Sequence, residues 1–197
     1  MKRELLRLLQ SQLRGQLSRT RRRRNRSFWA ISGLMLAIVV VSYILHEPKA
    51  PLSAFPKGAE LSCAIQSIYD GDTVTARCPS GQVKVRVFGI DAPEMKQEPW
   101  GARSRDVLRG LAPGRDPVRL RVMDQDRYGR VVAKVLVGEI DAGLELVRQG
   151  QAVVYRQYND VPAYLQAEAE ARRAKRGIWA QPGSHQDPAA WRRMNPR

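Results

Sequence analysis

The sequence predicts a small five-stranded β-barrel of the OB type with about three helices, an α+β fold, preceded by one transmembrane helix. Three observations lead to this expectation. Short segments with alternating apolar residues follow one another and are separated by turn residues. Segments with helical spacing stand between and after them, and an uncharged apolar stretch of eighteen residues lies near the N-terminus.

Length and composition set the first limits. A chain of 197 residues with 43% hydrophobic residues can hold one domain with extensions. Residues 1–27 hold ten Lys or Arg and one Glu, so they contribute +9 of the net charge of +15. The other +6 permits nucleic-acid binding without indicating it. Two histidines and two cysteines disfavour a serine–histidine hydrolase, a histidine-rich zinc site and a four-cysteine zinc site.

The N-terminal region predicts a membrane anchor. Residues 1–18 place leucines at helical spacing, which fits a surface helix or a helix lying on the inner membrane surface. Residues 28–45 carry no formal charge and would span roughly 27 Å as a helix, close to the hydrocarbon thickness of a bilayer. The positive-inside rule places residues 1–27 in the cytoplasm. We therefore expect a single-pass protein of the cytoplasmic membrane with its domain periplasmic or extracellular; a cleaved signal peptide is the alternative.

A Pro-rich linker at 46–57 leads to a folded domain at 58–180. The domain opens as an antiparallel meander with turns at Asp70–Gly71 and at 79–81. A hairpin turning at 126–129 follows later. The strands are expected at 61–69, 73–78, 83–89, 118–123 and 130–137.

Helix signals stand between and after these strands. A glycine follows the second and the third helix, and a proline begins the third. The helices are expected at 102–111, 141–149 and 162–176. Residues 181–197 are expected to form a tail, with Trp191 packing back on the domain.

Two acidic residues at strand ends suggest a cation site. Asp72 follows the Asp70–Gly71 turn, and Asp91 lies at the end of the third expected strand. Neighbouring strands of a barrel could bring both carboxylates to one ion, and an all-oxygen site suits Ca²⁺ or Mg²⁺. The alternative is that Asp70 and Asp72 are ordinary turn residues, because Asp and Gly favour turns.

Two arginines and a glutamate could complete such a site. Arg86 alternates with two valines and should face away from the apolar side of its strand, while Glu94 stands in a proline-restrained loop three residues after Asp91. Arg130 follows a Tyr–Gly turn. Two arginines directed at one anion fit a phosphate group, although each alone could be a surface residue.

Four motifs in this order resemble the staphylococcal nuclease (thermonuclease) family. They are Tyr69 to Thr73 (YDGDT), Arg86 to Glu94 (RVFGIDAPE), Asp126 to Arg130 (DRYGR) and Leu146 to Gly150 (LVRQG). The resemblance covers roughly residues 61–179. It implies an OB-fold barrel with helices and a Ca²⁺-dependent phosphodiesterase that cleaves DNA and RNA to products with 3′-phosphate ends.

The resemblance assigns roles residue by residue. Asp72 and Asp91 look like the calcium carboxylates, and Ala92 stands where the family lends a backbone carbonyl to the ion. Arg86, Glu94 and Arg130 match the catalytic residues, with Glu94 as general base and the arginines on the phosphate.

Aromatic residues are candidates for contact with the nucleotides. Tyr128 and Tyr158 match positions that contact the terminal phosphate and base, and Tyr155 is a further candidate, although Arg156 appears where another tyrosine is usual. Stacking on tyrosines predicts a preference for single-stranded nucleic acid. Packing of the same tyrosines in the core is the alternative.

The two cysteines predict a disulfide. Cys63 lies seven residues before the Asp70–Gly71 turn and Cys78 seven residues after it, so a regular hairpin would place them opposite each other. A bridge there is plausible outside the cytoplasm.

The sequence leaves two other functions open. One is a catalytically inactive nucleic-acid-binding OB-fold module tethered to the membrane, and the other is a membrane-tethered protein that binds a protein or peptide. No protein partner is expected for the nuclease itself.

Overall fold

The computed structural model describes residues 35–36, 55–114 and 116–196, and the chain forms two units, Met1–Glu47 and Pro48–Arg197. The basic segment at 1–27, the expected membrane helix at 28–45 apart from Met35 and Leu36, and linker residues 46–54 lie outside the described residues. Among the described residues, no helix has both the length and the apolar character needed to cross a membrane.

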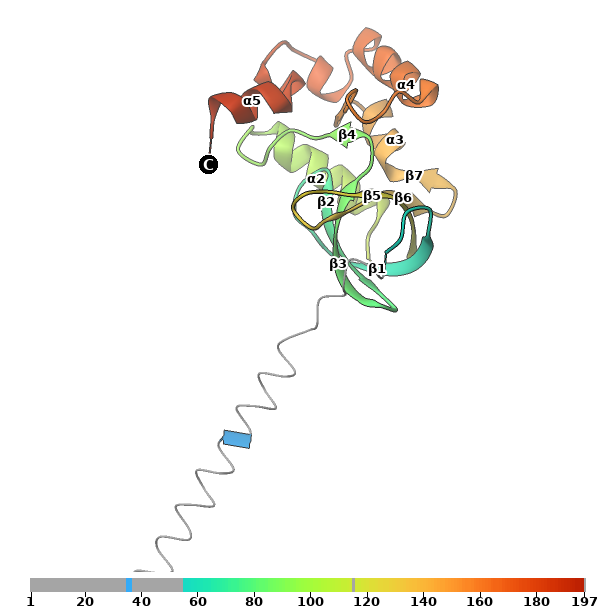
Figure 1. Ribbon diagram of the computed structural model, residues 1–197. Helices are drawn as coiled ribbons and strands as arrows, with labels where there is room; N and C mark the ends of the chain where they lie inside the picture. Colours follow the sequence, from blue (N-terminus) through green and yellow to red (C-terminus); the bar gives the residue numbers. More distant parts are fainter. Residues whose placement is uncertain (1–34, 37–54, 115, 197) are drawn as a thin grey trace, which may run out of the picture. The chain divides into compact units, whose positions relative to one another are not determined.

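Five strands of the second unit close into a barrel (Figure 1). Adjacent strands are antiparallel in the order β3–β2–β1–β5–β6, and β3 also pairs with β6 in parallel, which closes the ring. All five expected strands are present. Their bounds are β1 Glu60–Ile68, β2 Thr73–Cys78, β3 Gly81–Val87, β5 Val118–Gln125 and β6 Val131–Val137.

The barrel core follows the alternation in the sequence. The buried residues of β3 are Val83, Val85 and Val87, and the residues between them point outward. In the parallel pair, Val85 lies opposite Val131 and Arg86 opposite Val132. The outer face of β3 therefore carries the polar side chains, among them Arg86.

The helices lie toward the end of the barrel at which β3 leads into β4 (Figure 1). There the short strands β4 (Ile90–Asp91) and β8 (Val153–Val154) pair with each other, while β7 (Ile140–Asp141) pairs antiparallel with the end of β6. The three expected helices are present. The helices of this part of the chain are α2 Trp100–Leu111, α3 Ala142–Arg148, α4 Pro162–Arg173 and α5 Pro188–Met194, with single 3₁₀ turns at η2 Gly177–Trp179 and η3 Ser184–Gln186.

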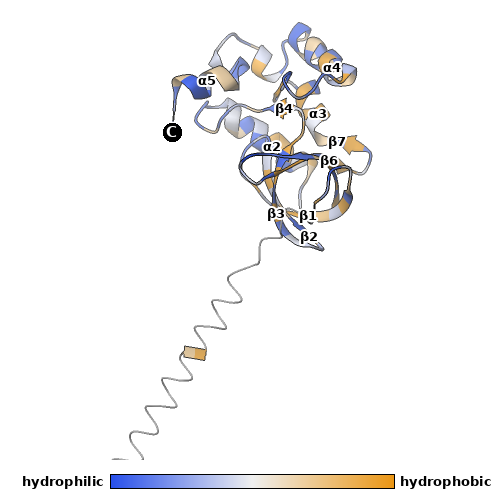
Figure 2. Cartoon of the chain, viewed as in Figure 1, coloured by the Kyte–Doolittle hydropathy of each residue, from blue (hydrophilic) through white to orange (hydrophobic). Residues whose placement is uncertain are grey.

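Helix α5 lies in the segment expected to be a tail. Asp187 caps its N-terminus by accepting the amide N–H of Ala190 at 2.7 Å, and Pro188 occupies the first turn. Hydrophilic colours mark the C-terminal end of the helix (Figure 2). Trp191 is half-buried, and its packing on the domain stays a prediction.

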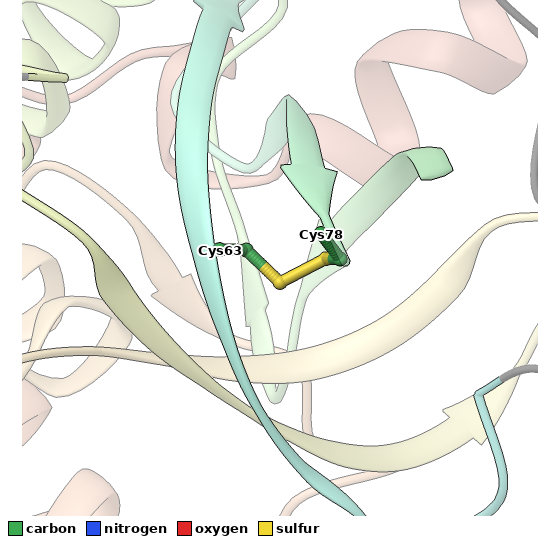
Figure 3. The surroundings of a disulfide bond; sticks show 2 residues. All are labelled: Cys63 and Cys78. Atoms are coloured by element: carbon green, nitrogen blue, oxygen red, sulfur yellow. A yellow bond between two sulfur atoms is a disulfide. The ribbon is translucent and has the colours of Figure 1, made fainter. Parts of the chain in front are cut away.

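The expected disulfide joins Cys63 of β1 to Cys78 of β2 (Figure 3). A β-bulge in β1 sets the register that brings the two cysteines opposite each other. Ile68 pairs with Val74 and Ser67 with Thr75, but the register shifts before Ile65, which pairs with Ala76. Without the extra residue, Gln66, the register at the turn would not bring the two cysteines opposite each other.

Candidate active site

Asp72 is fixed at the start of β2 by a tight turn. The side chain of Asp70 accepts the amide N–H of Asp72 at 3.0 Å, an Asx turn that orients the next carboxylate inward. Gly71 packs so closely on α2 that a Cβ there would lie 1.9 Å from Oγ of Ser104. The Asp72 side chain is 2% exposed, and its Oδ2 accepts the amide N–H of Ala92 at 2.9 Å.

Arg86 lies between the two aspartates. It forms ion pairs with Asp72 and, at 3.0 Å, with Oδ1 of Asp91. The same guanidinium donates to the carbonyl of Ile90 at 3.2 Å. The outward face of β3 thus places one positive group between two carboxylates that are nineteen residues apart in the sequence.

The loop after β4 carries the next acidic residue. Asp91 is 1% exposed because β4 pairs with β8, and Ala92 beside it is also buried. Glu94 is half-buried, and its amide N–H donates to Oε1 of Gln97 at 2.8 Å. Asp91, Ala92 and Glu94 are therefore held in one short loop next to Arg86.

The ionisation of this cluster is shifted by its surroundings. Burial, followed by the charge of Asp72, raises the pKa of Asp70 to about 7. Burial alone would lower the pKa of Arg86, but the charges of Asp72 and Asp91 outweigh it and raise that pKa. Arg86 therefore stays charged, whereas Asp70 is protonated below neutral pH.

Arg130 immediately precedes β6, the strand that pairs with β3, and its contacts lie within its own hairpin. Its Nε donates to Oδ2 of Asp126 at 2.7 Å, and its amide N–H donates to Oδ1 of the same residue at 2.9 Å. Its guanidinium also lies 5.6 Å from the centroid of the Tyr128 ring. Asp72 and Asp91, by contrast, are bound by Arg86.

The three candidate tyrosines gather near one arginine. Tyr128 is 69% exposed and Tyr158 62%, while Tyr155 meets Tyr158 edge-on at 5.0 Å between ring centroids. A hydrogen bond from Arg127 to the hydroxyl of Tyr128 raises the pKa of Arg127, and Tyr158 and Tyr155 act in the same direction. The guanidinium groups of Arg127 and Arg130 lie over the ring of Tyr128, at 4.9 and 5.6 Å from its centroid. Tyr155 is half-buried.

Sequence reasoning did not anticipate Arg192 of α5. Its Nη1 and Nη2 donate to Oδ1 and Oδ2 of Asp91 at 3.0 and 2.7 Å, and Nη1 also donates to Glu94 at 3.0 Å. Burial would lower the pKa of Arg192, but hydrogen bonds and charges from Asp91 and Glu94 raise it. The Asp–Pro start of α5 was a signal for a helix, but local spacing carries no signal for a contact 101 residues away.

The donor set fits a hard divalent cation with few protein ligands. Among the described residues, no group of three or more His, Cys, Asp or Glu side chains could hold a metal. Asp72 and Asp91 nevertheless converge on one positive group, and both are buried oxygen donors. A Ca²⁺ ion would find two carboxylates here, with backbone carbonyls or water as its other ligands.

The chain is similar to a known family and to known proteins. A family model described as "Staphylococcal nuclease homologue" matches residues 84–181, which include Arg86, Asp91, Glu94 and Arg130. The chain is 38% identical over 134 residues to an uncharacterized endonuclease from Haemophilus influenzae, covering 68% of this chain and 74% of that protein. It is 35% identical over 123 residues to an uncharacterized endonuclease from Escherichia coli, covering 62% and 79%.

A third relative carries a more specific name. The chain is 33% identical over 152 residues to a micrococcal nuclease from Shigella flexneri, covering 71% of this chain and 85% of that protein. Sequence motifs, a closed five-stranded barrel and these relatives agree. The chain belongs to the staphylococcal nuclease family.

Proposed function

We propose that this protein is a Ca²⁺-dependent nuclease that hydrolyses phosphodiester bonds of DNA and RNA and leaves 3′-phosphate ends. The observation that carries the proposal is the cluster in which Arg86 joins the buried carboxylates of Asp72 and Asp91, with Glu94 three residues further on. The family assignment and the names of the relatives support nuclease chemistry.

Asp72, Asp91 and the carbonyl of Ala92 are the residues that would hold Ca²⁺. When bound, the ion would supply positive charge next to the scissile phosphate and help orient the attacking water. The amide N–H of Ala92 already restrains Oδ2 of Asp72, so this side of the site is held in place by the backbone. An alanine can serve at position 92, because only its backbone N–H and carbonyl take part and no side-chain hydroxyl is required.

Glu94 would act as general base. It takes one proton of the attacking water while the new P–O bond forms and the P–O5′ bond breaks; the leaving O5′ takes a proton from solvent water, which gives a 3′-phosphate and a 5′-hydroxyl. The backbone of its loop is fixed by the bond from its amide N–H to Gln97. Its carboxylate is held in turn by Nη1 of Arg192 at 3.0 Å.

Arg86 and Arg130 would bind the non-bridging oxygens of the phosphate and stabilise the charge that grows on them. Both arginines hold carboxylates in this structure, Arg86 those of Asp72 and Asp91 and Arg130 that of Asp126. Binding of substrate therefore requires each guanidinium to exchange or share these partners. The proposal requires both guanidinium groups to reach one phosphate.

Single-stranded nucleic acid is the preferred substrate in this proposal. Tyr128 and Tyr158 present exposed rings next to Arg127, and stacked bases need unpaired strands. Tyr155 would support the ring of Tyr158 through its edge-on contact.

The proposed location is the outer side of the cytoplasmic membrane. The uncharged stretch at 28–45 after a block of arginines supports an anchor with a cytoplasmic N-terminus. The Cys63–Cys78 bridge supports an oxidising compartment for the domain. Protease treatment of intact spheroplasts tests it: the domain should be degraded, and its protection would refute the orientation.

The deciding experiment is a nuclease assay of the full-length chain on single- and double-stranded DNA and on RNA, with Ca²⁺ or with EDTA. We expect hydrolysis with Ca²⁺ only, fastest on single strands. Products should resist 3′ extension by a polymerase until a phosphatase removes the 3′-phosphate. Binding without hydrolysis would instead identify an inactive nucleic-acid-binding module.

A further inference from the structure

Arg192 donates hydrogen bonds to the carboxylate oxygens of Asp91, which are proposed ligands of the metal ion. Two of its nitrogens donate to both oxygens of Asp91, at 3.0 and 2.7 Å, and Oδ1 of Asp91 also accepts from Arg86 at 3.0 Å. Three arginine hydrogen bonds therefore converge on one buried carboxylate. Neither oxygen of Asp91 is without an arginine donor in this arrangement.

The same guanidinium links Asp91 to Glu94. Nη1 of Arg192 is 3.0 Å from Oδ1 of Asp91 and 3.0 Å from Oε1 of Glu94. Arg192 thus holds together the carboxylate proposed for the ion and the one proposed as general base. A divalent cation on the same carboxylates would lie close to this positive group and repel it.

The segment that carries Arg192 is docked by contacts of its own. The ring of His185 stacks on Trp100 of α2 at 4.4 Å between centroids, and its Nε2 is 2.9 Å from the carbonyl of Ile178. Gln97 donates to the carbonyl of Ser184 at 2.9 Å while its Oε1 accepts the amide N–H of Glu94. The position of Arg192 therefore follows from packing before α5 as well as from charge.

We propose that Arg192 is a further residue of the active site, a positioning residue that acts through Asp91 and Glu94 and competes with the divalent cation for Asp91. Its guanidinium balances the two negative charges while the ion is absent, and ion binding requires Arg192 to leave Asp91. The inference rests on the proposed function, because it takes Asp91 as a metal ligand.

The test is the Ca²⁺ affinity of the full-length chain, measured by isothermal titration calorimetry without nucleic acid. Arg192→Gln should bind Ca²⁺ more tightly than wild type, on the order of tenfold, because a competing charge is removed from a half-buried site. Arg192→Lys keeps the charge but loses the two-pronged contact, so its affinity should fall between the two.

Two further variants distinguish the loss of the Arg192–Asp91 contact from the loss of a positive charge on α5. Arg193→Gln removes the same charge from an exposed neighbour on α5 and should leave the affinity at the wild-type value. His185→Ala should also tighten Ca²⁺ binding, because it loosens the docking of α5 without touching Arg192. In wild type, Ca²⁺ should speed amide hydrogen exchange in residues 188–194.

The outcomes are distinct. Equal affinities of Arg192→Gln and wild type, or equal gains in Arg192→Gln and Arg193→Gln, would overturn the inference while leaving the nuclease proposal intact. Asp91→Asn that binds Ca²⁺ as well as wild type would instead refute the proposed metal site. If neither wild type nor Arg192→Gln binds Ca²⁺, both proposals fail.

Discussion

The amide N–H of Ala92 donates to Oδ2 of Asp72 at 2.9 Å, and this bond joins two strand ends that are twenty residues apart. Both residues are buried, so the bond is shielded from water. It aligns the turn that carries Asp72 with the loop that carries Asp91 and Glu94. A substitution in either segment should therefore displace the carboxylates of the other segment as well.

Gly71→Ala should destabilise the protein and lower nuclease activity. The added Cβ would meet Oγ of Ser104 at 1.9 Å and Cβ of Ala92 at 2.7 Å, and overpacking of this kind costs about 1–3 kcal/mol. Urea unfolding measures the change in the free energy of unfolding. Gly110→Ala is the matched control: nothing lies within 4 Å of its Cβ position in α2, so we expect a gain of about 0.5–1 kcal/mol.

Glu94→Gln should lower kcat by roughly 10² to 10⁴, because the amide cannot take a proton from water. The bond from the backbone of residue 94 to Gln97 is retained, so the fold should be unaffected. Steady-state hydrolysis of single-stranded DNA at saturating Ca²⁺ measures the effect. Glu98→Gln, an exposed change in the same loop, should keep wild-type activity, and a wild-type rate in Glu94→Gln would remove Glu94 from the mechanism.

Arg86→Ala and Arg130→Ala should each lower kcat/KM by about 10² or more, because each removes a group that stabilises charge on the phosphate. Arg86→Ala should also destabilise the fold, since the buried carboxylates of Asp72 and Asp91 lose their shared partner. Arg109→Ala provides the comparison, because Arg109 is an exposed arginine of α2 without a role in the proposed site. If Arg130→Ala behaves like Arg109→Ala, Arg130 binds no reacting phosphate.

Removal of the Cys63–Cys78 bridge should lower the free energy of unfolding by about 3 kcal/mol, the loss of chain constraint for a separation of 15 residues. Urea unfolding of Cys63→Ser/Cys78→Ser against wild type measures it. Ser80→Ala, a change in the neighbouring exposed turn, should have little effect. The unreduced, denatured wild type should show no reactive thiols; two would contradict the bridge.

The metal-free protein should lose stability as the pH rises from about 4 to about 7, through Asp70. Its pKa in the folded state is about 7, above the value of 3.8 for an unperturbed group, so the folded state binds the proton more tightly. The contribution is complete below pH 4 and is lost as the pH passes 7. In EDTA, the free energy of unfolding of Asp70→Asn should rise relative to that of wild type as the pH increases from about 4 to about 7. If the two proteins show the same dependence of this free energy on pH, Asp70 is not the group responsible.

Regular features of the fold could be predicted from the sequence, because alternation and turn residues are local signals. The strands around Val85 and Val135 follow from them, and so does the outward position of Arg86. The pairing of Cys63 with Cys78 was predicted from a regular hairpin, whereas the real hairpin needs a bulge at Gln66 to achieve it. No local pattern marks such a shift.

The candidate site could be predicted only in part, because tertiary contacts leave no local pattern in the sequence. Motifs mark Asp72, Asp91 and Glu94, which the fold brings into one region, although their roles remain predictions. The partners of the arginines depend on tertiary contacts. Asp126 holds Arg130, and Arg192 reaches Asp91 from a segment whose docking includes the stacking of His185 on Trp100.

The region matched by the family model ends at residue 181, yet Arg192 contacts Asp91 from beyond that limit. The candidate site inside the matched region is therefore contacted by a segment outside it. Under the proposal that Arg192 competes with Ca²⁺ for Asp91, removing the residues after 181 would take this competitor away. A chain trimmed at that boundary should then bind Ca²⁺ more tightly than the full-length chain.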